Sequence, residues 1–184
     1  MPLLGTTYSH RHSAYLRLDP HKAITDILSL RFTYLRLGCY WDEIEKVRGR
    51  YDFSAIVALL KECEKVNQQV VLTVSMKAPR WPEYYFPDWL NDKTPQGASP
   101  YLLPFITECI TKLSSYRCIT HWQVENEPLD PSGPRELSIS PSMLHKEVSW
   151  VKKLDTRPVV INLWGNELSK RNQLPVVIRF ADIV

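Results

Sequence analysis

Residues Ser54–Ser75, with the sequence SAIVALLKECEKVNQQVVLTVS, contain a helix pattern followed directly by a strand pattern. The first half predicts a helix over 54–65, because its apolar residues fall on one helical face: Ile56, Leu59, Leu60 and Cys63. The run from Gln69 to Ser75 is rich in β-branched residues and predicts a strand. A helix that leads into a short buried strand is the repeating unit of parallel α/β sheets.

The same alternation continues on both sides of this stretch. Asp19 and Pro20 form a favourable helix start, and apolar residues at helical spacing follow in Lys22–Leu30. The Pro-rich and aromatic segment Lys77–Ser99 is predicted to be an irregular loop. Further strands are predicted at Leu3–Thr7, Phe32–Leu37, Ile119–Val124 and Val159–Leu163, further helices at Tyr101–Ser115, Pro141–Leu154 and Gln173–Phe180, and the start of a sixth strand at Ala181–Val184.

Five successive strand–helix units predict an α/β fold that forms part of a TIM (β/α)8 barrel, with about five βα units and the start of a sixth strand. Because eight strands take roughly 250 residues, we expect 1–184 to be one domain that is incomplete on its C-terminal side. The competing architecture is an open flavodoxin-like sheet. That fold would carry a glycine-rich phosphate loop after the first strand, and the sequence has none there.

Composition limits the classes of partner. The formal net charge is +3, and Lys and Arg are scattered singly, so we expect neither nucleic acid nor a membrane surface as a partner. The four cysteines are far apart, which argues against zinc or a dense disulfide framework. Without a signal-peptide pattern the expected location is cytoplasmic; if further residues precede Met1, a secreted location is also compatible.

Polar and aromatic residues cluster directly after the predicted strands. The clusters are Arg36–Trp41, Lys77–Trp81, Glu125–Glu127 and Asn162–Trp164. In α/β barrels the active site lies at the C-terminal ends of the strands, so this distribution indicates a functional rim.

Glu125 and Glu127 would lie on the same face if their strand continued, because side chains alternate along a strand. We therefore expect the chain to turn after Glu125, so that Glu127 projects over the barrel mouth with Asn126 beside it. A buried carboxylic acid with a raised pKa at this position could protonate a glycosidic oxygen. The alternative for Glu127 is a solvated loop carboxylate before Pro128.

Several motifs occur together in one order: Tyr34–Gly38 (YLRLG), Trp41–Glu45 (WDEIE), Gly49–Phe53 (GRYDF), Pro79–Pro82 (PRWP) and Gln123–Pro128 (QVENEP). With them, the whole chain resembles the N-terminal part of the clan A glycoside hydrolases, (β/α)8 enzymes that include β-galactosidases and cellulases. The resemblance implies that 1–184 is a glycoside hydrolase catalytic domain.

The resemblance also implies residue roles. Glu127, at the end of the fourth strand, matches the general acid/base, and Asn126 matches a ligand of the sugar 2-hydroxyl. Arg36 matches an arginine that keeps the nucleophilic carboxylate ionised and oriented. The alternative for Arg36 is a rim ion pair.

Three tryptophans are candidates for contact with substrate. The resemblance places Trp41 and Trp81 in the walls of the sugar cleft, where stacking would contribute on the order of 1 kcal/mol each. Loop packing is the alternative for both. Trp164, after the fifth strand, is a similar candidate, with packing the favoured interpretation.

Retaining hydrolysis needs a second carboxylate about 5 to 5.5 Å from the acid/base. In clan A it ends the seventh strand, so we expect no nucleophile in this chain; Glu167 belongs to the fifth unit and is expected in an exposed loop. We expect a hydrolase of O-glycosyl bonds of the retaining β-glycosidase type, a fragment of a carbohydrate-metabolism enzyme with little activity alone. Its ligand would be an oligosaccharide or β-glycoside, and no cofactor is expected.

Two alternatives come from other functional classes. One is a non-catalytic carbohydrate-binding or assembly protein derived from such an enzyme. The other is an unrelated barrel enzyme with a metal, but no His, Asp and Glu set at ligand spacing supports a metal site. An unclosed sheet would leave strand edges open, and we expect these to favour self-association.

Overall fold

The computed structural model describes residues 3–164 and 174–184. Its strands form one parallel sheet in the order β1-β2-β3-β4-β5, which is also their order in the chain. The strands are β1 Gly5–Thr7, β2 Tyr34–Gly38, β3 Gln69–Val74, β4 Ile119–Val124 and β5 Val159–Val160. The helices are α1 His10–Tyr15, α2 Pro20–Ser29, α3 Trp41–Ile44, α4 Ser54–Lys65, α5 Pro95–Leu113, α6 Pro141–Leu154 and α8 Leu174–Val177.

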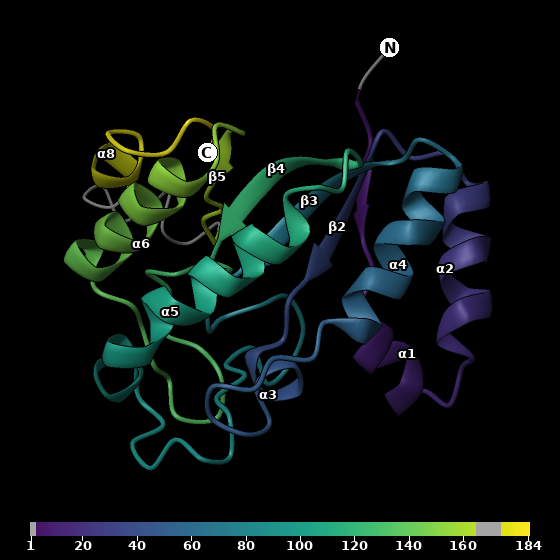
Figure 1. The fold of residues 1–184 in the computed structure, drawn as a ribbon. Helices are drawn as coiled ribbons and strands as arrows, with labels where there is room; N and C mark the ends of the chain where they lie inside the picture. The colour runs from purple at the N-terminus through teal and green to yellow at the C-terminus, as the bar shows by residue number, and fades with distance from the viewer. Residues whose placement is uncertain (1–2, 165–173) are drawn as a thin grey trace.

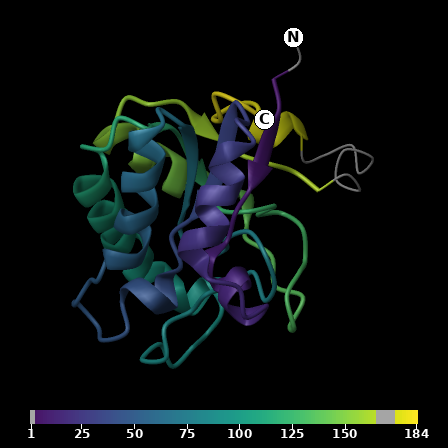
Figure 2. The ribbon, with the colours of Figure 1, turned by 90° about the vertical axis from the view of Figure 1, so that its right-hand side faces the viewer.

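The strand order confirms the predicted partial barrel. Each strand pairs with the next in sequence, and the long helices α2, α4, α5 and α6 lie on one side of the sheet (Figures 1 and 2). A doubly wound sheet would have helices on both sides and a reversal of strand order. Sequential parallel strands with helices on one side instead form the curved wall of a (β/α) barrel.

Local sequence signals explain most element boundaries. Asp19 accepts hydrogen bonds from the first backbone N–H groups of α2, and Pro20 occupies the first helical turn. Ser140 caps α6 in the same way, with Pro141 behind it. The structure gives α4, β4 and α6 the ranges predicted from the sequence.

Other boundaries differ from the prediction. Helix α5 begins at Pro95 instead of Tyr101, because Thr94 caps it and its early turns bury Ala98 and Leu102, even though Pro100 lies inside the helix. Strand β5 is only two residues long, and the short helices α1 and α3 were not predicted. The final residues behave as expected for a starting strand: Ile183 makes a parallel bridge to Val160 beside β5.

The core lies between the sheet and its helices. Strand residues on this face are completely buried, for example Leu35, Leu72 and Trp122, and they pack against α4, α5 and α6. All four cysteines are buried and unpaired. Among the described residues no helix is both long and apolar enough to cross a membrane.

Candidate active site

The candidate site lies at the C-terminal ends of the strands, where the long loops gather below the sheet in the view of Figure 1. It combines Arg36 from β2, Lys77 after β3, Asn126 and Glu127 after β4, and Asn162 after β5. They come from four segments that are far apart in the sequence. The parallel sheet brings them to the same edge.

The chain turns sharply after β4. The strand ends at Val124, and both Glu125 (φ 60°) and Glu127 (φ 46°) have left-handed backbone conformations. Such values are unusual for residues other than glycine, and where they occur they often mark functional sites. The turn expected after Glu125 is therefore present, and it directs the side chains of Glu125 and Glu127 differently.

Neighbouring strands fix the backbone of Glu127. Its N–H donates to Asn162 Oδ1 at 3.1 Å, and its carbonyl accepts from Lys77 Nζ at 2.6 Å. Lys77 is completely buried, and its ammonium also donates to the Asp130 carbonyl at 3.1 Å and pairs with Glu83 at 3.4 Å. The position of Glu127 thus depends on β3 and β5 as well as on β4.

The Glu127 side chain is half-buried. Burial raises the pKa of its carboxyl group, Glu83 and Asp130 raise it further, and Lys77 and Arg36 oppose the rise. A raised pKa is the direction that a general acid needs near neutral pH. The carboxylate makes no hydrogen bond to any residue that the structure describes, so it remains available to a ligand.

A network of neutral amides joins Arg36 to this turn. Asn126 Oδ1 accepts from Arg36 Nη1 at 3.2 Å and from Asn162 Nδ2 at 3.2 Å. Gln123 accepts from Arg36 at 3.4 Å and donates to Asn162 at 2.8 Å. Because the Asn126 oxygen is occupied twice, its amide nitrogen faces outward from the network. That nitrogen donates to no acceptor in the described part of the chain.

The Arg36 guanidinium has no carboxylate partner among residues 3–164 and 174–184. Its bonded neighbours are Thr7 (2.9 Å), Gln123 and Asn126, all of them neutral. Desolvation is the main reason that the pKa of Arg36 is lowered, which reflects a buried positive charge without a direct ion pair. The rim ion pair considered from the sequence is therefore not what this structure shows.

A pair of buried carboxyl groups lies beneath the turn, and no sequence pattern indicated a role for this pair. Glu125 is completely buried and accepts from the N–H groups of Met76 (3.4 Å) and Lys77. Glu147, 1% exposed on α6, accepts from Ser75 at 2.7 Å and approaches Glu125. Burial raises the pKa of Glu125 to about 7, and burial and the neighbouring Glu125 raise the pKa of Glu147 well above its usual value, so the pair holds a proton near neutral pH.

The three candidate tryptophans lie in different environments. Trp41 is completely buried, stacks on Phe105 at 5.2 Å, and donates its indole N–H to Glu45 at 2.6 Å. Its ring offers no face to a ligand, so the expected place in a cleft wall is wrong and the packing alternative describes it. Trp81 is 71% exposed and Trp164 is 48% exposed, and both lie on the rim.

The sequence predicted no individual role for several residues of the site, although some lie within the clusters at the strand ends. Lys77 and Asn162 directly follow predicted strands, and that position was the available signal. Glu147 lies on a helix 72 residues after Ser75, and nothing in the local pattern indicates that it reaches the site. Glu167, considered as a second carboxylate, lies outside the described residues.

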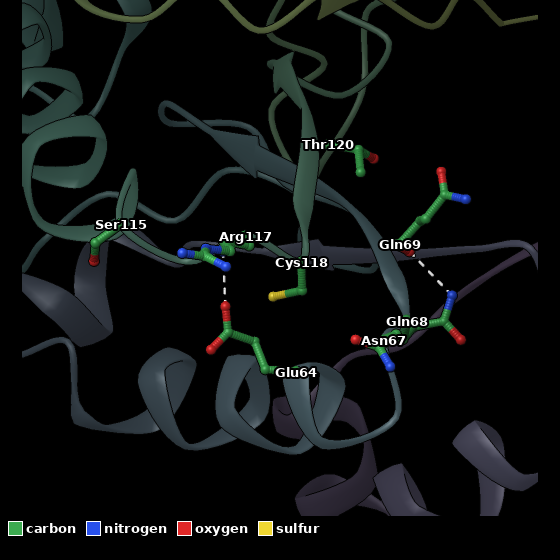
Figure 3. A pocket seen from close by; sticks show the side chains of 8 residues that line it. All are labelled: Glu64, Asn67, Gln68, Gln69, Ser115, Arg117, Cys118 and Thr120. Carbon is green, nitrogen blue, oxygen red and sulfur yellow. Dashed lines mark hydrogen bonds between the residues drawn. The ribbon is translucent and has the colours of Figure 1, made fainter.

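The largest hollows lie at the opposite edge of the sheet. One of about 420 Å³ is bordered by residues at the starts of β3 and β4 (Figure 3), and one of about 780 Å³ adjoins it. Two of the polar residues there are paired within the chain: the backbone N–H of Arg117 donates to Glu64 at 2.7 Å, and Gln68 donates to backbone carbonyls. This is the edge at which barrels carry stability and not catalysis.

Sequential parallel strands with helices on one side define the fold of part of a (β/α)8 barrel, and the solved structures that it is similar to are glycoside hydrolases. They include GH5_18 from Streptomyces cattleya in complex with GlcNAc (16% identity, TM-score 0.61, 88% of this chain and 44% of that chain). Another is a psychrophilic glycoside hydrolase family 10 endo-β-1,4-xylanase (14% identity, TM-score 0.66, 95% of this chain and 58% of that chain). A third is xylanase 10B from Thermotoga petrophila RKU-1 in complex with xylobiose (18% identity, TM-score 0.61, 89% of this chain and 50% of that chain).

At these identities the similarity shows the fold alone. The chain spans between 44% and 58% of the length of these three proteins. No family model and no curated protein matches the sequence.

Proposed function

We propose that this chain carries the acid/base side of a retaining β-glycoside hydrolase site. Glu127 is the acid/base, Asn126 donates its free amide N–H to the sugar 2-hydroxyl, and Arg36 is the cation that orients the nucleophilic carboxylate. The observation that carries the proposal is the shared Asn126 carboxamide. It links a partly buried guanidinium, which has no ion pair among the described residues, to the turn that bears a half-buried carboxyl group with a raised pKa.

The chemistry follows from these positions. Protonated Glu127 donates its proton to the glycosidic oxygen as the bond to the anomeric carbon breaks. As a carboxylate it then accepts a proton from the water that releases the sugar. In the clan the nucleophile ends the seventh strand, and we assign that role to no residue of this chain.

Turnover of β-glycosides with different leaving groups tests the role of Glu127. Glu127→Gln should lower hydrolysis of substrates with poor leaving groups, such as alkyl or sugar aglycones, by at least about 100-fold. Activated dinitrophenyl glycosides should lose much less, because their leaving group needs no proton. The control is Glu136→Gln, an exposed carboxylate on the same rim.

We also expect the absolute rate of glycoside hydrolysis to be low. Without an assigned nucleophile, turnover by the 184 residues alone should lie several orders of magnitude below that of complete glycosidases. Rapid turnover abolished by Glu127→Gln would confirm the acid/base and overturn the expectation of low activity. Equal turnover by Glu127→Gln and by wild type, for every leaving group, would refute the proposed role.

Exposed rim aromatics support a second candidate, a carbohydrate-binding protein without catalysis. Trp81 offers an open ring face near the site, and Trp164 lies on the same rim. Calorimetric binding of β-linked oligosaccharides separates the two functions. Binding without any turnover, unchanged by Glu127→Gln, would favour the binding protein.

A further inference from the structure

A hollow of about 290 Å³ lies beside the candidate site, between α1 and the loop after β3. Exposed aromatic side chains form part of its lining: Trp81 from the loop, and Tyr15 from α1, which is 81% exposed. An aromatic ring with a free face is a surface on which a sugar ring can stack.

The charged side chains that line this hollow are cationic. They are Arg11 and Arg80, with His12 beside them, and no Asp or Glu belongs to the lining. Arg80 is exposed, and the one hydrogen bond that its side chain makes in the described structure is a long one, 3.5 Å to the Thr7 carbonyl. Its charge has no carboxylate partner among the described residues.

Arg11 is held in place and keeps donors to spare. Its guanidinium pairs with Asp42 and lies over the rings of Tyr40 and Tyr85, at 5.4 and 4.9 Å from their centroids. One of its N–H groups donates to Asp42, and a guanidinium has five N–H donors. The polar groups that remain free in the hollow are therefore mostly hydrogen-bond donors, the N–H groups of the two arginines.

The backbone around Arg80 and Trp81 is also fixed. The Tyr85 hydroxyl donates to the carbonyl of Arg80 at 3.1 Å or of Trp81 at 3.4 Å, and Tyr85 itself is buried. Tyr85 packs edge-on against Tyr40 at 4.5 Å. The backbone that carries Arg80 and Trp81 is therefore held in place by Tyr85.

Thr7 connects the hollow to the candidate site. Its hydroxyl accepts from Arg36 at 2.9 Å, while its carbonyl accepts from Arg80. Thr7 is therefore a shared neighbour of Arg36 in the candidate site and of Arg80 in the hollow.

We propose that the hollow is a subsite for a negatively charged sugar unit, with its ring on Trp81 and its carboxylate or sulfate ester on Arg80 and Arg11. The inference rests on the proposed sugar-processing function and adds the substrate class. A neutral sugar hydroxyl both donates and accepts, whereas a carboxylate or sulfate only accepts and matches the planar guanidinium donors. Because the free guanidinium N–H groups have no acceptor in the protein, they favour a ligand that carries a carboxylate or sulfate ester.

Calorimetric titration of the chain with β-linked oligosaccharides of equal length tests the subsite. One oligosaccharide is neutral, one carries uronate carboxylates, and one carries sulfate esters. We expect at least one anionic ligand to bind about tenfold tighter than the neutral one, since bonds to charged groups are the stronger ones. The tighter anionic ligand identifies the group.

Single substitutions test which side chains cause the tighter binding of the anionic oligosaccharide. Arg80→Gln should remove the preference for the anionic ligand and leave neutral binding unchanged, and Trp81→Ala should weaken both. Arg31→Gln is the matched control, because it removes an exposed arginine from the opposite edge of the sheet. It should change neither affinity.

Two results overturn the subsite and leave the proposed function standing. One is equal affinity for neutral and anionic ligands. The other is a loss in Arg31→Gln as large as that in Arg80→Gln, which shows general charge attraction. Absence of binding by every oligosaccharide overturns both the subsite and sugar recognition by this chain.

Discussion

At the scale of single residues, the site depends on buried polar groups that have few alternatives. Asn126, Gln123 and Asn162 are neutral amides whose donors and acceptors fit one another, and the Asn126 amide nitrogen donates to no described residue and remains for a ligand. Beneath them, Glu125 and Glu147 are two carboxyl groups without a cation between them. An ionised carboxylate only accepts hydrogen bonds, and Glu147 Oε1 has no partner unless one of the two acids carries a proton.

This pair predicts a loss of stability as the pH rises from mildly acidic to neutral. Both pKa values are raised in the folded state, so the contribution of the pair is complete below about pH 4.5 and is lost as pH rises through about 7. The Glu125 shift alone corresponds to a loss on the order of 3 kcal/mol in the free energy of unfolding. Urea unfolding at a series of pH values measures it.

Glu147→Gln isolates the cause. An amide can donate to Glu125 without a proton from solvent, so this variant should show a much flatter dependence between about pH 5 and 8. Glu108→Gln, an exposed acid on α5, should keep the wild-type slope. A wild-type stability that is constant over this range, or an unchanged slope in Glu147→Gln, would contradict the shared proton.

At the scale of elements, sequence patterns predicted those helices for which the apolar positions and the capping residues indicate the same start. Helix α5 shows where they disagree: Gly97 and Pro100 look like loop residues, yet Thr94 and Pro95 form a good helix start. The helix begins at that start because burial of Ala98 against the sheet outweighs the weak local propensity. Tertiary packing of this kind cannot be read from a local window of sequence.

Gly97 also predicts an unusual stability effect. In a helix Gly→Ala normally stabilises by about 1 kcal/mol. Here a Cβ atom at Gly97 would lie 2.5 Å from the Asp92 Cβ and closer still to its carbonyl oxygen. Gly97→Ala should therefore lower the unfolding free energy, by about 1 to 3 kcal/mol.

Thermal and urea unfolding of two variants checks this sign. Gln96→Ala, at the exposed neighbouring position, should change stability by no more than about 0.5 kcal/mol. If Gly97→Ala is as stable as wild type or more so, the loop before α5 can move away from the helix without cost, and the close approach to Asp92 has no structural role.

At the scale of the whole molecule, the sequence predicted the fold because βα repetition leaves few topologies. It also predicted Arg36, Asn126 and Glu127 at one rim, since parallel strands all end on the same side. It left open whether Trp41 packs or lines the cleft, and it did not predict that α6 supplies Glu147 to the turn after β4. Both depend on which helix face meets which strand, and that is decided by packing between distant segments.

The unpaired edge of β1 leads to the last prediction, association of the chain with itself. Within residues 3–164 and 174–184, strand β1 pairs only with β2, and Leu3 and Leu4, just before it, are 72% and 59% exposed. An apolar edge with free backbone groups favours pairing with another chain. We expect sedimentation velocity to show dimers or larger species that increase with protein concentration.

A lysine at this edge should oppose pairing, because a charge on an edge strand must stay in water. Leu4→Lys should therefore shift the chain toward monomer at equal concentration. Leu30→Lys, at the 65%-exposed end of α2, adds the same charge away from the edge and should leave the distribution unchanged. A concentration-independent monomer for wild type would mean that the β1 edge is too short to pair, and a shift in Leu30→Lys equal to that in Leu4→Lys would assign association to net charge.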